Sequence, residues 1–333
     1  MIVTVYGGGS WGTALAHALA CAGRETRLLV RDAAVAEAVN ERGENPRYLP
    51  GLRLHEGVRA EVDLSVLARS DLWVLAVPCQ SQRAALEGVR RLLRPNTVLV
   101  NAAKGIELSS LKPMSKVAAE ALGRPGDFSR RYAVLSGPSF AREVVERKPT
   151  AVVLGGADEA LGASLRELFA TTWFRSDSST DVRGVELGGA VKNVIAIAAG
   201  VSDGLNFGHN ARAALITRGL AEITRLGVAL GARPATFMGL SGVGDLMLTC
   251  AGDLSRNRQV GLRLGRGESL TAITAAMHTV AEGVKTSAAV YRLAQSLGVD
   301  MPITAAMNAV LDGSLSPADA VRGLMSRALK EEG

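Results

Sequence analysis

The hydrophobic residues in the first half of the chain form short runs separated by longer amphipathic stretches. Four runs are largely apolar and short enough to be strands buried on both faces, at residues 2–6, 72–77, 98–100 and 132–135. A further strand is predicted over residues 27–30, and helices are predicted over residues 11–22, 33–40 and 81–93. Strands that alternate with helices in this way favour a parallel sheet covered by helices.

The pattern changes after Trp173. Residues 176–181 form a polar run, which is a candidate domain boundary. No strand is predicted beyond it, whereas long helical patterns cover residues 185–201 and 211–230 and resume from residue 269. We therefore expect an α/β fold with two domains, a parallel-sheet domain over residues 1–180 and an all-helical domain over residues 181–333.

A glycine-rich turn follows the first predicted strand. Residues 7–12 are Gly-Gly-Gly-Ser-Trp-Gly, a G-x-G-x-x-G pattern that opens a predicted helix. In this context Gly7 permits a tight turn, Gly9 lets the backbone approach a diphosphate, and Gly12 lets the helix pack on the strand. The helix N-terminus also offers free N–H groups to phosphates. The pattern predicts a Rossmann-type, dinucleotide-binding first domain, and a glycine-rich turn without a ligand is the plainer alternative.

Two charged residues with opposed implications end the second predicted strand. Asp32 stands about twenty residues after Gly12, where an acid binds the ribose 2′-hydroxyl of NAD. Arg31 beside it suits the 2′-phosphate of NADP. The alternatives are solvated loop charges and, for Asp32, a cap on the helix that begins at Ala33. We expect NADP(H) to be favoured, with NAD(H) also used.

Lys192 is the only charged residue between Leu187 and Ser202. Partial burial on so apolar a helix would lower the pKa of its ammonium group and prepare it for proton transfer. Snorkelling to solvent is the alternative. Gly188 and Gly189, one turn earlier, favour a site because glycine lets a ligand approach the backbone. Lys192 is therefore the candidate acid/base residue.

Three further polar segments are candidate ligand sites. Residues 255–258 are Ser-Arg-Asn-Arg, which at a helix start would form an anion site with Arg256 gripping a phosphate. Residues 136–139 and 104–105 follow predicted strands, at the sheet edge where parallel sheets place ligands. The alternatives are an N-capping Ser255 with solvent-facing arginines, a simple turn, and a solvated Lys104.

Composition narrows the class of protein. Of the 333 residues, 47% are hydrophobic and 21% charged, a globular balance that excludes a disordered chain. Aromatic residues make up 4%, too few for the stacking platforms of single-strand nucleic-acid binders. The net charge of +6 is spread along the chain without a block of like charges. We expect a small anionic substrate and no nucleic-acid partner.

The cysteines and histidines predict no metal site. Three cysteines make no CxxC pair and four histidines show no metal-ligand spacing, which favours a reducing compartment. Residues 14–21 resemble a lipoprotein signal, yet no basic residue precedes Arg24 and the stretch is too short to span a membrane. We expect a buried helix in a cytoplasmic protein without stable membrane insertion, with secretion as the alternative.

Together these motifs resemble glycerol-3-phosphate dehydrogenases of the bacterial NAD(P)-dependent type. The matching segments are residues 7–14, 45–50, 104–105, 136–141, 191–194, 213–219, 244–246, 255–258 and 282–283. One such segment alone would be weak support. The ordered set spans the chain, with an α/β half before a helical half, and is therefore specific.

The resemblance implies hydride transfer between NAD(P)H and dihydroxyacetone phosphate, giving sn-glycerol 3-phosphate for glycerophospholipid synthesis. The family's lysine matching Lys192 accepts the proton when the alcohol is oxidised. Residues that match substrate-binding positions are Lys104, Gly137, Ser139, Lys192, Asp245, Ser255, Arg256 and Asn257. Residues that match cofactor-contacting positions, with Gly7, Gly9 and Gly12, are Ser10, Trp11, Arg31, Tyr48, Lys104, Ala141, Arg256, Val280 and Glu282.

The roles inferred from the residues agree with this implication. Arg256 and Ser255 suit the phosphate, and Lys192 would donate a proton to the carbonyl oxygen as hydride arrives at carbon. Asp245 would orient Lys192 or a substrate hydroxyl. No metal is needed, because an ammonium group polarises the carbonyl.

One departure and two alternatives remain. The family often has an aromatic residue at the end of the second strand, where this chain has Leu29 and Val30, so the adenosine-side contacts are open. A hydroxyacid dehydrogenase of the 6-phosphogluconate dehydrogenase type would share the domain order and a catalytic lysine but would need a carboxylate site. A non-catalytic NAD(P) sensor would keep residues 7–12 without needing Lys192. A homodimer through the apolar faces of the C-terminal helices is also expected.

Overall fold

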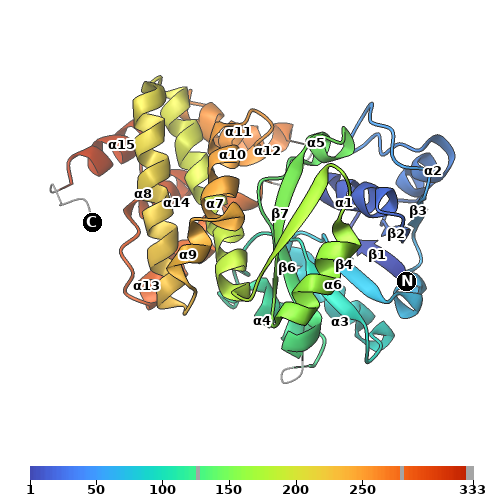
Figure 1. Cartoon of the computed structure of the whole chain (residues 1–333). Helices are drawn as coiled ribbons and strands as arrows, with labels where there is room; N and C mark the ends of the chain where they lie inside the picture. The colour runs from blue at the N-terminus through green and yellow to red at the C-terminus, as the bar shows by residue number, and fades with distance from the viewer. Residues whose placement is uncertain (125–127, 278–280, 328–333) are drawn as a thin grey trace.

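The computed structural model describes residues 1–124, 128–277 and 281–327. Its first half contains an eight-stranded sheet in the order β3-β2-β1-β4-β5-β6-β7-β8 (Figure 1). Neighbouring strands from β3 to β6 pair in parallel, β7 runs antiparallel to β6, and β8 is parallel to β7. The strands are β1 (Ile2–Tyr6), β2 (Glu25–Leu29), β3 (Val58–Glu61), β4 (Leu72–Leu75), β5 (Val98–Asn101), β6 (Tyr132–Ser136), β7 (Thr150–Gly156) and β8 (Phe174–Ser179).

Helices cover both faces of this sheet. One core joins the sheet to α1, α5 and α6, through residues such as Leu15, Val144 and Leu165. A second core lies on the other face, where α3 and α4 contribute Leu86 and Ala118. These helices are α1 (Ser10–Cys21), α2 (Ala33–Arg42), α3 (Gln82–Val89), α4 (Met114–Ala121), α5 (Ala141–Val145) and α6 (Glu159–Phe169).

The second half is helical throughout its described residues, and α7 (Val182–Gly204) is its central element (Figure 1). The remaining helices include α8 (Gly208–Ala229), α9 (Pro234–Phe237), α10 (Asp245–Ala251), α11 (Arg256–Gly265), α12 (Leu270–Ala276), α13 (Glu282–Ser296), α14 (Pro302–Asp312) and α15 (Pro317–Met325). By length and hydropathy α7 is the one described helix that could cross a membrane, but its apolar window is entirely buried within the protein. It is therefore a core helix.

Close packing of α11 on α7 depends on glycine. A Cβ at Gly261 would overlap the carbonyl oxygen of Ile197, and a Cβ at Gly265 would lie 2.6 Å from that of Val201. Because the two helices are so close, the first turn of α11 lies against the middle of α7, where Asn257 donates to Asn193.

The predicted α/β architecture is confirmed, but three strands, β3, β7 and β8, were missed. β3 and β8 lie at the two edges of the sheet and keep polar residues on their exposed faces, so neither has the apolar run of a central strand. The polar run at residues 176–181, in which a boundary was predicted, consists largely of the end of β8, and Asp181 after it caps α7. The sheet is also not wholly parallel, because β7 reverses direction.

Candidate active site

The glycine-rich loop joins β1 to α1. Gly7 has φ +123° and a Cβ there would lie 2.7 Å from the carbonyl carbon of Ala76, so both conformation and space require glycine. A Cβ at Gly12 would overlap the carbonyl oxygen of Gly7, whereas no atom lies within 4 Å of one at Gly9. Gly7 and Gly12 thus permit the close packing, and Gly9 leaves open space at the N-terminus of α1.

The residues beside this space fit a dinucleotide. No side chain caps α1, so its first N–H groups are free for phosphate oxygens. Within the described structure the buried Nε1 of Trp11 has no hydrogen-bond partner. Ser10 Oγ donates to the carbonyl oxygen of Tyr48 at 2.9 Å, which brings two predicted cofactor residues together. Asn45 Nδ2 donates to the carbonyl oxygen of Gly8 at 3.0 Å and so fixes the loop.

The two charges after β2 have separate environments. Asp32 caps α2 by accepting from the Ala34 N–H at 3.0 Å, and its other oxygen pairs with Arg47 at 2.9 Å. The helix-cap alternative for Asp32 is therefore correct. Arg31 is exposed. Its charge has no ion-pair partner among the described residues.

Lys192 lies in a buried cluster with two acceptors and a second lysine. Its Nζ donates to Asp245 Oδ1 at 2.5 Å and to Thr249 Oγ1 at 2.6 Å. The other oxygen of Asp245 accepts from Lys104 Nζ at 2.6 Å, and Lys104 also donates to the carbonyl oxygen of Gly137 at 3.2 Å. One carboxylate from α10 thus holds ammonium groups from α7 and from the loop after β5.

Burial and charge set the protonation of this cluster. Burial lowers the pKa of Lys192 to about 8; the Asp245 carboxylate acts against this shift and the Lys104 charge adds to it. Burial alone would raise the pKa of Asp245, but the two ammonium groups outweigh it and hold that pKa below its ordinary value. Lys192 can therefore gain or lose a proton near neutral pH while Asp245 stays ionised.

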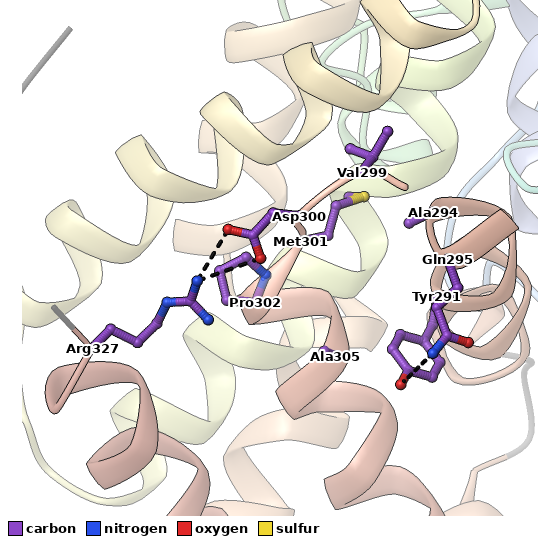
Figure 2. Close-up of a pocket in the computed structure, with 9 residues that line it drawn as sticks. All are labelled: Tyr291, Ala294, Gln295, Val299, Asp300, Met301, Pro302, Ala305 and Arg327. Atoms are coloured by element: carbon purple, nitrogen blue, oxygen red, sulfur yellow. Dashed lines mark hydrogen bonds and ion pairs between the residues drawn. The ribbon is translucent and has the colours of Figure 1, made fainter. Parts of the chain in front are cut away.

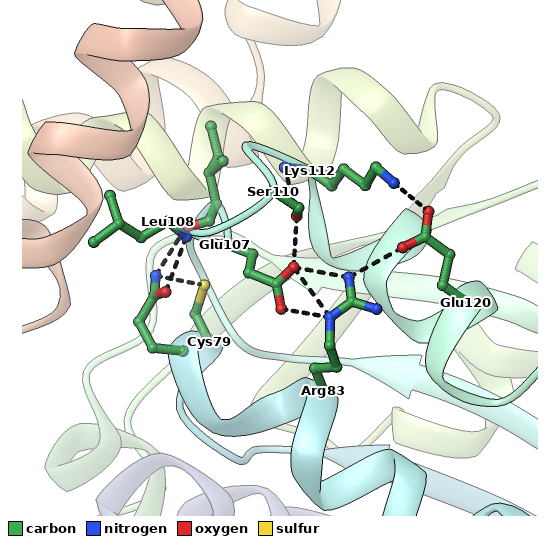
Figure 3. A network of polar contacts seen from close by, with 9 residues as sticks. Cys79, Arg83, Glu107, Leu108, Ser110, Lys112 and Glu120 are labelled. Atoms are coloured by element: carbon green, nitrogen blue, oxygen red, sulfur yellow. Dashed lines mark hydrogen bonds and ion pairs between the residues drawn. The ribbon is translucent and has the colours of Figure 1, made fainter.

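A polar network holds the loop that carries Lys104 (Figure 3). The amide group of Gln80 donates to the Ile106 carbonyl oxygen at 2.8 Å and accepts from the Leu108 N–H at 3.0 Å. Arg83 binds Glu107 through three hydrogen bonds of 2.8, 2.9 and 3.2 Å. These residues were not predicted from the sequence, because their side chains act through contacts between the start of α3 and the distant loop after β5.

The comparisons with known proteins agree with this geometry. Family models described as the N-terminus and the C-terminus of NAD-dependent glycerol-3-phosphate dehydrogenase match residues 2–162 and 181–322. The chain belongs to this family. A glycerol-3-phosphate dehydrogenase [NAD(P)+] from Nitratidesulfovibrio vulgaris is 61% identical over 333 residues, with 100% of both chains covered. One from Geobacter sulfurreducens is 51% identical over 331 residues, covering 99% of this chain and 98% of the relative.

Solved structures place the fold in the same family. The crystal structure of glycerol-3-phosphate dehydrogenase from Coxiella burnetii has a TM-score of 0.92 and 37% identity, covering 98% of this chain and 99% of that one. The resemblance drawn from the motifs is therefore confirmed, and the chain is an NAD(P)-dependent oxidoreductase acting on a small molecule.

The structure places the other predicted substrate residues in different environments. Ser139 Oγ donates to the Gly137 carbonyl oxygen at 2.9 Å, beside Lys104. Ser255 caps α11 by accepting from the Arg258 N–H at 3.2 Å, so the N-cap alternative is correct. Arg256 is exposed, but Arg258 is buried against Asp203 at 2.7 Å, so the alternative of solvent-facing arginines is wrong for Arg258.

Asn257 connects α11 to α7 and to the start of α13. Its Nδ2 donates to Asn193 Oδ1 at 2.9 Å and its Oδ1 accepts from the Gly283 N–H at 3.0 Å. Adjacent to Gly283, half-buried Glu282 accepts from the Cys79 N–H at 3.1 Å. Asn193 was missed although it neighbours Lys192. Val280 lies outside the described residues.

Gly188 and Gly189 have a different role from the predicted one. A Cβ at Gly188 would overlap the carbonyl oxygen of Ser241, and one at Gly189 would lie 2.6 Å from Ser136 Oγ. Protein atoms, not a ligand, thus approach these glycines. Gly189 still bears on the site through its neighbour Ser136. The Ser136 Oγ is buried without a partner in the described structure and lies on the Lys104 side of α7.

Two surface hollows lie away from the Lys192 cluster. One of 190 Å³ is lined by residues of α13, α14 and the segment between them, with an Asp300–Arg327 ion pair at 3.0 Å along one side (Figure 2). The other, of 410 Å³, is lined by Cys21 at the end of α1 and by Arg147. Neither is lined by Lys192, Lys104 or Asp245, so charge and burial, not cavity size, identify the candidate active site.

Gly9 and Gly12 provide a matched pair of substitutions. Gly9→Val should fold normally, because Gly9 has φ −72° and open space around it, but the side chain would fill the space beside the free N–H groups. We expect NADPH affinity to fall more than about tenfold, as one lost charge-assisted hydrogen bond would cause. Gly12→Val should instead lower the melting temperature. Fluorescence titration and thermal unfolding separate the two, and unchanged NADPH affinity in Gly9→Val would contradict the site.

Proposed function

We propose that this chain interconverts dihydroxyacetone phosphate and sn-glycerol 3-phosphate with NAD(P)H, and that Lys192 is the proton donor and acceptor. The observation that carries the assignment of Lys192 is its burial beside Asp245 with a pKa lowered to about 8. The coenzyme, when bound, supplies the hydride or accepts it. In reduction the Lys192 ammonium gives its proton to the carbonyl oxygen, and in oxidation the neutral amine takes it back.

The neighbouring residues bind and orient the substrate in this proposal. Asp245 holds Lys192 and Lys104 at its two oxygens, so two ammonium groups lie beside one carboxylate and would favour a developing alkoxide. The exposed guanidinium of Arg256, at the N-terminus of α11, takes the phosphate, with Ser255 and Asn257 beside it. Gly137 and Ser139 complete the substrate side next to Lys104.

The coenzyme would lie along the carboxyl edge of the sheet. Its diphosphate fits the space at Gly9, next to Ser10 and Trp11. Arg31 would bind a 2′-phosphate, and because Asp32 is engaged by Arg47 and Ala34, NADP(H) is the proposed preference. The remaining proposed contacts are Tyr48, Lys104, Ala141, Arg256, Val280 and Glu282.

We further propose the wider setting of the enzyme. The division into domains at residues 180 and 181 is supported by the cap that Asp181 places on α7. A cytoplasmic location, the absence of stable membrane insertion and the supply of glycerol 3-phosphate for glycerophospholipid synthesis follow from the family. A homodimer through the helical half is consistent with exposed Val228 and Met238.

The assay that tests the reaction follows the nicotinamide absorbance band. Dihydroxyacetone phosphate is offered with NADPH or with NADH, and consumption of coenzyme is expected with both, faster with NADPH. Hydroxyacids serve as comparison substrates. Binding of coenzyme without turnover would overturn the proposed reaction and favour a hydroxyacid dehydrogenase or a sensor.

The two directions should have opposite pH dependences. Because reduction needs the Lys192 ammonium, its kcat should fall as the pH rises through about 8, and the kcat of oxidation should rise over the same interval. Initial rates at saturating substrate measure both. Buried Glu186, with a pKa raised to about 7 by burial, is the control, and Glu186→Gln should leave the break in place. Breaks of the same sign in both directions would contradict the role of Lys192.

A further inference from the structure

The 410 Å³ hollow lies at the opposite end of α1 from the glycine-rich loop. Its polar lining comes from Cys21, His55, Arg147, Thr171 and Thr172, with Trp173 forming one wall, and it includes no carboxylate. Cys21 stands ten positions after Trp11 along the helix, so the hollow is roughly 15 Å from the loop. We name it the Arg147 pocket.

Arg147 stands in this pocket at a cost to the backbone. Its φ is +57°, the left-handed region, which is strained for a residue with a side chain. The turn ends α5, where the Lys148 N–H donates to the Glu143 carbonyl oxygen at 2.9 Å, and glycine is the common residue at such a position. The neighbouring Lys148 pairs with Glu146 at 2.9 Å. Arg147 itself has no acidic partner among the described residues.

The side chains facing Arg147 are hydrogen-bond donors. Thr171 Oγ1 accepts from the Trp173 and Phe174 N–H groups, so its proton is free to donate. His55 Nδ1 accepts from the Gly57 N–H at 3.0 Å, which leaves Nε2 as the donor when the ring is neutral. One fixed positive charge thus meets at least two further donors.

His17 beneath the pocket does not change this balance near neutral pH. Its Nδ1 accepts from the His55 N–H at 3.0 Å and its Nε2 lies 3.4 Å from Cys21 Sγ. Burial, with the nearby Arg147 charge, lowers its pKa to about 4, so the ring stays neutral. The charge of the pocket therefore comes from Arg147.

We propose that the Arg147 pocket binds a small organic anion through a phosphate or carboxylate group. The Arg147 guanidinium, which contacts the Cys21 thiol but has no acidic partner among the described residues, grips the anionic group, and Thr171 and His55 donate to its remaining oxygens. The volume of 410 Å³ exceeds what a bare ion needs and falls in the range of small-molecule sites. The ligand would be held apart from the substrate and coenzyme.

Cys21 reports on occupancy of the pocket. It is partly exposed there, whereas Cys79 and Cys250 are buried. The rate of its alkylation by iodoacetamide, followed by mass spectrometry, should fall severalfold and saturably when inorganic phosphate or citrate is added at constant ionic strength set with chloride. Protection by phosphate alone assigns a phosphate group, protection by citrate alone assigns a carboxylate, and both outcomes support the site.

Two variants keep the test decisive. Arg147→Gly relieves the strained backbone, so its melting temperature should equal or exceed that of the wild type, while protection of Cys21 is lost. Lys148→Gln removes the same charge from the adjacent exposed position and should leave protection unchanged. No protection in the wild type, or equal protection in Arg147→Gly, would overturn the proposal.

Discussion

Replacing Lys192 with methionine is expected to lower kcat in both directions by roughly a hundredfold to ten-thousandfold, the usual contribution of a positioned acid or base. Methionine fills a similar volume but carries no proton. Because Asp245 keeps Lys104 as a partner at 2.6 Å, the buried carboxylate is not left unpaired and the fold should persist. Turnover of dihydroxyacetone phosphate, NADPH affinity and melting temperature are measured together.

The controls for this substitution separate chemistry from folding. Lys112 is a surface lysine that pairs with Glu120, and Lys112→Met should leave turnover unchanged. Lys192→Met should bind NADPH as the wild type does, because the glycine-rich loop and not Lys192 holds the diphosphate in the proposal. Turnover within a few-fold of wild type in Lys192→Met would remove Lys192 from the proposed mechanism.

Local sequence predicts those parts of the fold whose signals are contiguous. The strand, glycine turn and helix of residues 2–22 follow from one pattern, and the structure has β1 and α1 there. The same pattern does not predict edge strands such as β8 (Phe174–Ser179), because half their residues face solvent and remain polar. Their assignment depends on pairing with β7, which is a tertiary contact.

The residues of the candidate site likewise include some with a local sequence signal and some without one. Lys192 stood out because a single charge on an apolar helix has few explanations. Lys192 lies beside Asp245, which is 53 residues away in the sequence, and Lys104 lies beside the same carboxylate from 141 residues away. No local sequence rule predicts either contact, and only the resemblance suggested them. The supporting contacts of Gln80 and Arg83 join the start of α3 to the loop after β5 through their side chains and have no sequence pattern of their own.

Replacing Asp245 with asparagine should lower both stability and activity. The substitution leaves the ammonium groups of Lys192 and Lys104 without their shared carboxylate, and breaking a buried pair in this way costs about 3–5 kcal/mol. Without the carboxylate the pKa of Lys192 should fall further below about 8, since burial and the Lys104 charge, which lower it, then outweigh what remains to raise it. The proton donor would then be depleted at neutral pH, and the break in the reduction profile should move to lower pH.

The pH dependence of stability distinguishes this explanation from a simple packing defect. A lysine with a lowered pKa in the folded state binds fewer protons than in the unfolded chain at pH values between the two pKa values, so stability rises with pH across that interval. In Asp245→Asn the interval should begin at lower pH than in the wild type. Asp203→Asn is the matched control, because Asp203 pairs with buried Arg258 at 2.7 Å away from Lys192. It should destabilise the protein without moving the reduction profile, and an equal displacement of that profile in both variants would show that Asp245 does not act through Lys192.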